Sequence, residues 1–138
     1  MSEEYKIISV EKPEWAIIGG GIQDYNIEMG GELNSQSLCF VLQGPVEEVL
    51  GGVIGSTYWD WLYIDLMWIK EELRGCGYGQ QLLSLAEDEA RKQGAKNVYL
   101  DTFSFQALGF YQKYGYQVFG KLNDFPAGHQ RYFLTKQL

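Results

Sequence analysis

The first thirty residues combine a strand-like pattern with a helix-like one. Residues 5–10 are short and β-prone, and Pro13 follows where a helix can begin, because its missing N–H costs little near a first turn. Gly30 and Gly31 are expected to end that helix, while the triplet at 19–21 is expected to weaken or kink it. Six apolar residues follow roughly helical spacing: Trp15, Ile17, Ile18, Ile22, Tyr25 and Met29.

A run of strands is predicted next. Residues 37–43 and 48–58 are β-branched, aromatic or aliphatic, and Gly44-Pro45 separates them at a turn. Trp59-Asp60-Trp61 has the character of a hairpin tip, and it leads into a further apolar stretch over residues 62–69. These segments therefore predict three strands joined by turns.

The second half of the chain alternates between helix and strand. Residues 78–93 are amphipathic, and Gly94 is a natural helix end. The apolar positions of this helix recur at intervals of three and four: Leu82, Leu83, Ala86 and Ala90. We expect a second helix over 106–113 and strands over 97–103, 116–122 and 130–138. Such alternation predicts a single α/β (α+β) domain over residues 1–138, with helices covering a parallel or mixed sheet.

Composition narrows the class of protein. A chain of 138 residues with 46% hydrophobic content can bury a core without disulfides or a structural metal. The net charge of -7 argues against a nucleic-acid protein, which would normally need a basic face. No run of about 18 apolar residues occurs, so no membrane partner is expected. We expect a soluble, cytoplasmic protein.

Cysteine and histidine content limits the available chemistry. Cys39 and Cys76 do not form the disulfide framework of a small secreted domain, and we expect both to be reduced. His129 is the single histidine, so zinc sites and Ser-His-Asp chemistry have little to draw on, and no metal is expected.

A glycine-rich loop joins the predicted strand 62–69 to the predicted helix 78–93. Residues 74–79 read Arg-Gly-Cys-Gly-Tyr-Gly. A helix N-terminus has unpaired N–H groups and partial positive charge, and glycines let a phosphate approach the backbone. The dinucleotide pattern fails because Gln80 stands where a third glycine is needed, and the Walker A pattern fails because no Lys-Ser or Lys-Thr pair follows. The loop therefore predicts another kind of anion site.

A second block completes a recognisable pair of motifs. Residues 107–116 read Ala-Leu-Gly-Phe-Tyr-Gln-Lys-Tyr-Gly-Tyr, and the first loop follows the pattern Arg-x-x-Gly-x-Gly. In this order the two segments resemble the GNAT superfamily of N-acetyltransferases, which use acetyl-coenzyme A. The N-terminal third matches the family only in its general order of elements. The resemblance implies a mixed, mostly antiparallel central sheet flanked by helices, with two splayed parallel strands over 62–69 and 97–103 that admit the pantetheine arm.

The resemblance also implies which residues contact the cofactor. The loop would hold the pyrophosphate through Arg74, Gly75, Cys76, Gly77, Tyr78 and Gly79. Backbone groups of Met67, Trp68 and Ile69 would serve the pantetheine and the oxyanion, if a bulge exposes N–H groups there; the alternative is ordinary strand core. Ser104 stands where the family often has an asparagine that contacts the pantetheine, so it is the cofactor-binding candidate at that position, with a hydroxyl in place of the side-chain amide.

The same resemblance implies an acid, while the base stays open. Tyr111 corresponds to the family's general acid, and an ordinary tyrosine pKa of about 10 keeps a phenol protonated at neutral pH; its alternative is a packed aromatic. A water-mediated base is Asp65 or Asp101, although strand alternation could turn either away, and a structural carboxylate is the alternative. Asp24 and Glu28, one helical turn apart, could instead meet a cationic substrate, or form a plain exposed face.

Aromatic residues suggest an acceptor pocket, because an aromatic wall suits a cationic amine. Core packing explains most of them equally well, and His129 is a further acceptor or base candidate with a plain loop role as its alternative. The candidates are Trp59, Trp61, Trp68, Phe103 and Phe105.

We therefore expect an acyltransferase that moves acetyl from acetyl-coenzyme A directly to a primary amine, with a small-molecule amine as the acceptor. The alternatives are acetylation of a protein N-terminus or lysine, and a non-catalytic acyl-coenzyme A sensor. Members of the family are often dimers, so a homodimer is one expectation, although no stretch of the sequence commits to an interface.

Overall fold

The computed structural model describes residues 4–138, and the chain forms two compact units, Met1–Leu33 and Asn34–Leu138. Each unit is described by itself. The prediction of a single domain over residues 1–138 stays a prediction. Among residues 4–138, no helix is both long and apolar enough to cross a membrane.

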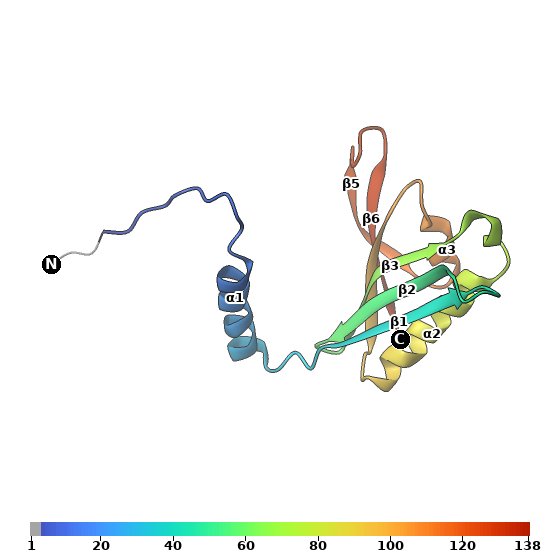
Figure 1. The fold of residues 1–138 in the computed structure, drawn as a ribbon, viewed down its shortest axis with the longest axis horizontal. Helices are drawn as coiled ribbons and strands as arrows, with labels where there is room; N and C mark the ends of the chain where they lie inside the picture. Colours follow the sequence, from blue (N-terminus) through green and yellow to red (C-terminus); the bar gives the residue numbers. More distant parts are fainter. Residues whose placement is uncertain (1–3) are drawn as a thin grey trace. The chain divides into compact units, whose positions relative to one another are not determined.

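The N-terminal unit contains one helix, α1 (Trp15–Gly30) (Figure 1). This helix is continuous through the glycine triplet, so the expected kink is absent; glycine adopts helical angles readily, and its cost is one of entropy. Gly31, at φ 87°, ends it and donates its N–H to the carbonyl of Ile27 at 2.8 Å. Residues 5–10, predicted as a strand, have no assigned strand, because β propensity forms a strand only where a ladder partner is present.

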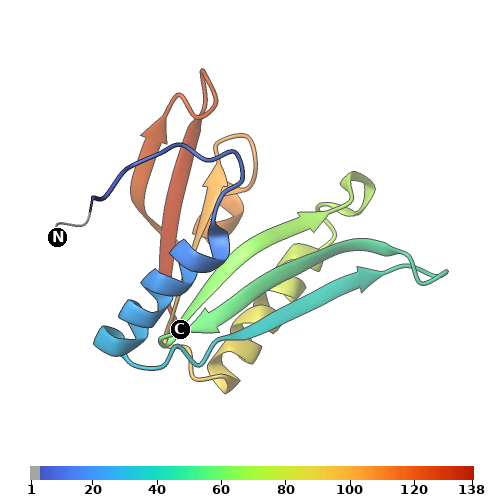
Figure 2. The ribbon, with the colours of Figure 1, turned by 60° about the vertical axis from the view of Figure 1, so that its left-hand side comes forward.

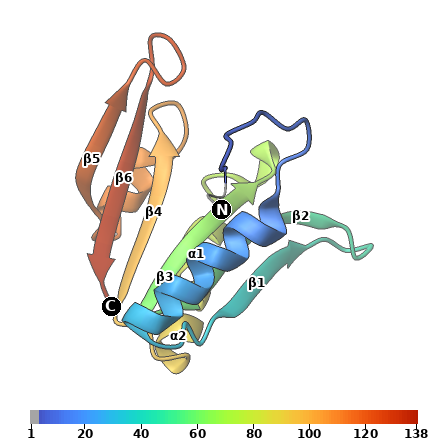
Figure 3. The same ribbon diagram turned by 90° about the vertical axis from the view of Figure 1, so that its left-hand side faces the viewer.

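The C-terminal unit is built on a six-stranded sheet (Figure 3). Its strand order is β1-β2-β3-β4-β6-β5, and every neighbouring pair is antiparallel except β3 and β4. The fold class expected from the sequence is therefore confirmed. The strands are β1 (Gln36–Gln43), β2 (Val49–Tyr58), β3 (Trp61–Ile69), β4 (Asn97–Phe103), β5 (Gln117–Asn123) and β6 (Gln130–Gln137).

Two helices and one short 3-10 turn accompany the sheet. The turn η1 (Glu71–Leu73) follows β3, α2 (Tyr78–Lys92) follows the glycine loop, and α3 (Leu108–Lys113) follows β4. The predicted hairpin tip is confirmed: Trp59 and Asp60 both have positive φ, as a two-residue type I′ turn requires.

One face of the sheet and α2 form the core. The helix packs on β1, β2 and β3 with the apolar positions that its periodicity predicted. Alternate strand residues meet it, and Val53, Leu62 and Val98 are fully buried. In this unit taken by itself, aromatic and charged side chains on the opposite face remain partly exposed, and this face, hereafter called the open face of the unit, carries most of the chemistry described below.

The sheet splits between its two parallel strands (Figure 2). Pairing of β3 with β4 runs only from Trp61 opposite Asn97 to Tyr63 opposite Tyr99. Beyond that pair the strands separate into a V, with β1 to β3 in one arm and β4 to β6 in the other. The expected splay of two parallel strands is therefore present.

Candidate active site

The glycine loop has the backbone shape of an anion site. Gly75 and Gly77 have φ of 75° and 88°, values that favour glycine, and a Cβ at either would meet no atom within 4 Å. Gly77 is also the residue before the first turn of α2, whose first N–H groups have no partner within the helix. The loop therefore presents backbone donors to open space, which suits a phosphate group.

The third glycine of the loop has a packing role. A Cβ on Gly79 would lie 3.2 Å from the Phe110 ring of α3 and 3.3 Å from Cδ1 of Ile69 on β3. Gly79 thus lets the start of α2 approach β3 and α3 closely. The loop, the end of β3 and the start of α3 consequently form one packed corner.

Arg74 lies at the same corner. Its Nε donates to the carbonyl of Ile69 at 2.9 Å, so the guanidinium lies at the end of β3 beside the loop. Cys76 is exposed and its thiol lies 3.7 Å from the Arg74 carbonyl. The loop therefore combines one fixed cation with open backbone donors.

One edge of β3 is left without a strand neighbour. Met67, Trp68 and Ile69 are in regular register with β2 on one side, but β4 has already separated on the other. The bulge that sequence reasoning expected among these residues lies earlier, at Asp65, where Ile54 of β2 is opposite Leu66 and Gly55 is opposite Ile64. The free backbone groups at residues 67–69 are therefore a consequence of the splay between β3 and β4, and not of the bulge.

The two carboxylate candidates occupy matching positions in the two arms of the V. Tyr63 and Tyr99 form the last parallel pair, and their rings stack at 4.8 Å on the open face. Asp101 follows Tyr99 by two residues, so strand alternation directs it toward that same face. Asp65 lies at the bulge, where alternation is interrupted. It is exposed, and after burial its charge and that of Asp101 raise the pKa of Tyr63, which indicates that both carboxylates lie near the stacked rings. The sequence alone could not decide where these two carboxylates point, because alternation along a strand does not reveal which face of the sheet is open.

Asp101 is the more constrained of the two carboxylates. Its Oδ1 accepts bonds from Arg131 Nη2 at 2.7 Å and Nε at 2.9 Å, and the pair is largely buried. The same guanidinium lies over three rings, at 5.1 to 5.5 Å from the centroids of Phe125, Phe133 and Phe103. Asp65, by contrast, is exposed and has no ion pair within residues 4–138.

Tyr111 lies on α3, within the core. Its side chain is 6% exposed, and burial, followed by the charge of Asp101, raises the pKa of Tyr111 to about 12. Tyr116 fixes the residue twice, through a backbone bond to the Tyr111 carbonyl at 3.1 Å and a ring contact at 5.6 Å. The phenol is therefore protonated across the neutral range, as a general acid must be.

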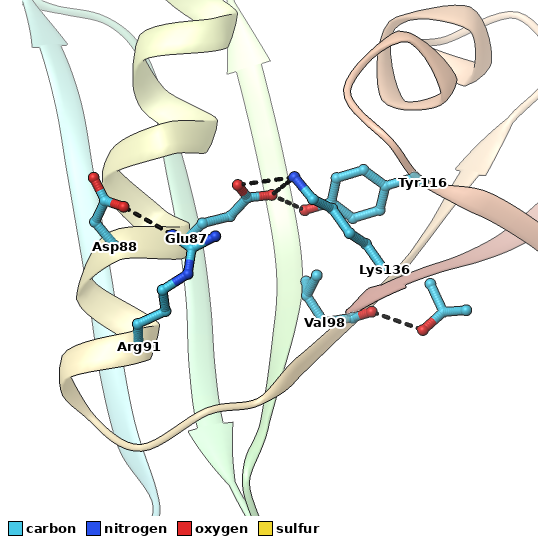
Figure 4. A network of polar contacts seen from close by, with 7 residues as sticks. Glu87, Asp88, Arg91, Val98, Tyr116 and Lys136 are labelled. Carbon is cyan, nitrogen blue, oxygen red and sulfur yellow. Dashed lines mark hydrogen bonds and ion pairs between the residues drawn. The ribbon is translucent and has the colours of Figure 1, made fainter. Parts of the chain in front are cut away.

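Tyr116 belongs to a buried polar group that sequence reasoning missed (Figure 4). Its hydroxyl donates to Oε2 of Glu87 on α2 at 2.7 Å, and Nζ of Lys136 on β6 lies 3.1 Å from the same oxygen. This arrangement ties α2, in one arm, to β6, in the other. Only the position of Glu87 on the apolar side of α2, between Ala86 and Ala90, could have indicated a buried partner.

The remaining candidates are dispersed. Ser104 bonds with Gln130 twice, through its N–H and through its hydroxyl oxygen, and so closes the β4–β6 ladder. His129 is exposed and its ring contacts Phe105 edge-on at 5.1 Å. Asp24 and Glu28 are exposed on α1 in the N-terminal unit, and an acceptor role for them stays a prediction.

The expected aromatic wall is divided into two groups. Phe103 and Phe105 stack on each other at 5.4 Å beside Arg131, and Trp68 is exposed on β3. Trp59 and Trp61 instead line a separate hollow of about 390 Å³ at the closed end of the V. Its lining residues are Tyr58, Trp59, Trp61, Tyr99, Phe119 and Thr135.

Comparison with known proteins agrees with this geometry. Residues 5–116 match the family model described as Acetyltransferase (GNAT) family. The chain is 35% identical over 113 residues to acetyltransferase Atu2258 of Agrobacterium fabrum, covering 82% of each protein. It is 39% identical over 96 residues to blasticidin-S acetyltransferase of Streptomyces morookaense, covering 69% of this chain and 71% of that protein.

A solved structure extends the match to the fold. An acetyltransferase from Bacillus cereus superposes with a TM-score of 0.91 at 34% identity, covering 97% of this chain and 98% of that one. The chain therefore belongs to the acetyltransferase (GNAT) family, and it is an acyltransferase. Its loop fits the phosphates of acetyl-coenzyme A, because residues 74–79 combine open backbone donors with a cation.

Proposed function

We propose that this protein transfers an acetyl group from acetyl-coenzyme A directly to a primary amine of a small molecule. The observation that carries the proposal is the convergence of donor-side and acceptor-side groups on the V between β3 and β4. The glycine loop and the free edge of β3 lie along one arm, while Asp101 lies on the other arm and Tyr111 follows it on α3.

On the donor side, the chain's own groups bind and orient. Gly75, Gly77 and Arg74 hold the phosphates, and backbone N–H groups along the free edge of Met67 to Ile69 stabilise negative charge on the thioester oxygen. Tyr111 gives its proton to the departing thiolate. Its surroundings support this role, since burial and Asp101 keep the phenol protonated.

On the acceptor side, a carboxylate must help an ammonium to lose its proton, because an amine with a pKa of about 10.4 is mostly charged at neutral pH. Asp65 is exposed and unpaired with any cation in residues 4–138, which suits contact through water. Asp101 is held by Arg131 and fits a positioning role better than proton exchange. We therefore favour Asp65 as the water-mediated base.

A small-molecule acceptor is supported by one relative. The protein from Streptomyces morookaense is described as a blasticidin-S acetyltransferase, and it shares 39% identity with this chain over 96 residues. The acidic net charge of -7 also favours a cationic acceptor over an anionic one.

The test is release of free thiol from acetyl-coenzyme A across a panel of polyamines, aminoglycosides, nucleoside antibiotics, amino acids and short peptides. We expect strong turnover with at least one small amine and little with the peptides. Turnover restricted to peptides would replace the small-molecule acceptor with a protein one.

A binding measurement separates the remaining alternatives. Acetyl-coenzyme A at about 100 times its dissociation constant should stabilise the fold by about 2.7 kcal/mol, read as a rise in Tm. Stabilisation without turnover on any amine would indicate a sensor. No stabilisation at all would contradict the proposed coenzyme site itself.

A further inference from the structure

The aromatic hollow at the closed end of the V has no role in the steps above. It is lined by five aromatic residues and Thr135, and has a volume of about 390 Å³, within the range of small-molecule sites. Its residues come from the β2–β3 hairpin, from the start of β4 and from β5 and β6. The hollow is thus built by both arms of the sheet where they join.

The wall of this hollow offers ring surfaces in place of polar groups. The hydroxyls of Tyr58 and Tyr99 bond to each other, and the Thr135 hydroxyl donates to the carbonyl of Val98 at 3.0 Å. No charged side chain is among the lining residues. A ligand part that enters must therefore be apolar, and flat rings pack best on such faces.

A continuous aromatic wall leads from the hollow to the carboxylates. Trp61 contacts the Tyr99 ring edge-on at 5.9 Å, and Tyr99 stacks on Tyr63 at 4.8 Å. Asp65 and Asp101 lie two residues beyond that stacked pair, which is about 7 Å along a strand. Burial, and then the charges of Asp101 and Asp65, raise the pKa of Tyr63, which agrees with this closeness.

This spacing specifies the shape of an acceptor. The amine of the acceptor must reach the carboxylates to be acetylated in the V. The part of the acceptor that enters the hollow is therefore a part remote from that amine. We propose that the hollow formed by Tyr58, Trp59, Trp61, Tyr99, Phe119 and Thr135 is an acceptor subsite for a flat, apolar ring carried at least about 7 Å from the reacting amine. This inference rests on the proposed amine acetylation and names the substrate class within it.

The test compares two probes, 4-phenylbutylamine and butylamine, which share the four-carbon chain and the primary amine and differ only in the ring. The wild-type protein should show a kcat/KM roughly tenfold higher for the ring-bearing amine, about what one well-packed aromatic contact contributes. Trp61→Ala and Phe119→Ala should each reduce this ratio to below about threefold, while kcat/KM for butylamine and the KM for acetyl-coenzyme A stay unchanged.

Both substituted side chains are partly exposed, at 37% for Trp61 and 62% for Phe119, so folding should survive. Leu122→Ala is the matched control: Leu122 is an exposed apolar residue of β5 outside the hollow, and its loss should leave the ratio at the wild-type value. A ratio near one in the wild-type protein, or one that survives both hollow variants, would overturn the inference.

Calorimetry with 4-phenylbutylamine, without coenzyme, separates this inference from the proposed function. Binding that weakens at least fivefold in Trp61→Ala supports the subsite even if no amine is acetylated. Turnover of both amines without ring preference sinks the subsite and leaves the proposed function standing. An absence of binding, together with a change of oligomeric state in Trp61→Ala, would assign the hollow to protein contacts and overturn the subsite.

Discussion

At the scale of single residues, burial decides what Tyr111 can do. The sequence contains ten tyrosines, and the motif alone distinguishes this one. In the folded chain its pKa is raised to about 12, with burial as the main cause and Asp101 as the second. A phenol in this state keeps its proton through the whole physiological range, so it is present in the acid form that a proton donor to the departing thiolate requires.

Replacing Tyr111 by phenylalanine tests the acid directly. Tyr111→Phe should lower kcat by about 10²-fold or more, with the dissociation constant of acetyl-coenzyme A nearly unchanged, because only the proton donor is lost. Steady-state kinetics and calorimetry measure the two quantities. Tyr114→Phe is the control, since Tyr114 contacts the Phe110 ring at 5.0 Å near the same helix and should retain activity. Full activity in Tyr111→Phe would remove it from the mechanism.

The carboxylates show how neighbours separate two similar residues. Asp65 and Asp101 each stand two residues beyond the last parallel pair in the sequence, yet Asp65 lies at a bulge and Arg131 binds only Asp101. A paired and largely buried carboxylate is costly to disturb, while an exposed one exchanges protons with water easily. This contrast is the physical reason to favour Asp65 as the base.

At the scale of elements, the junction of β3, the glycine loop and α2 is the part that we propose binds the donor. Gly75 and Gly77 provide backbone angles that other residues adopt only with strain, and Gly79 provides close packing against α3. The three glycines of one motif therefore have two different physical functions.

Gly77→Ala separates ligand binding from backbone strain. An alanine at φ 88° costs about 1 to 2 kcal/mol and should also tilt the backbone donors, so we expect a lower Tm and a KM for acetyl-coenzyme A raised about tenfold. Gly94→Ala is the matched control, because Gly94 has φ of 92° and equally open surroundings at the far end of α2. It should lower Tm similarly and leave KM unchanged. Equal KM values in the two variants would contradict a phosphate role for the loop.

At the scale of the whole molecule, buried tyrosines couple stability to alkaline pH. Burial raises the pKa values of Tyr99, Tyr111 and Tyr116, and the Glu87 carboxylate contributes further at Tyr116. In the unfolded chain a tyrosine loses its proton at about pH 10, so above that pH the unfolded state binds fewer protons than the folded state. The free energy of unfolding must then fall as pH rises.

We expect the free energy of unfolding to decrease between about pH 10 and 12, by roughly 2 to 3 kcal/mol from Tyr111 alone. Denaturant titrations at several pH values measure this slope. Tyr111→Phe should flatten it, whereas Tyr25→Phe, at an exposed position of α1, should not. An equal slope in both variants would contradict the burial argument.

Sequence patterns alone predicted the secondary structure of the C-terminal unit closely, because each of its elements carries its own signal. Runs of β-branched, aromatic and aliphatic residues marked the strands, the three-to-four spacing marked α2, and Trp59-Asp60-Trp61 marked the hairpin tip. The N-terminal third was less predictable. Its glycine triplet does not interrupt α1, and β propensity at residues 5–10 produced no strand without a partner.

The sequence by itself determined the family, and it singled out residues 74–79 as the proposed donor loop and Tyr111 as the acid candidate, because these depend on short contiguous motifs whose local conformation is nearly self-specified. Only the tertiary structure decided which face of β3 and β4 is open, that Arg131 pairs with Asp101, and that Tyr58, Trp61, Tyr99 and Phe119 meet in one hollow. These residues are far apart in the chain, so their contacts depend on strand register and on the point where two parallel strands separate, which no local pattern records.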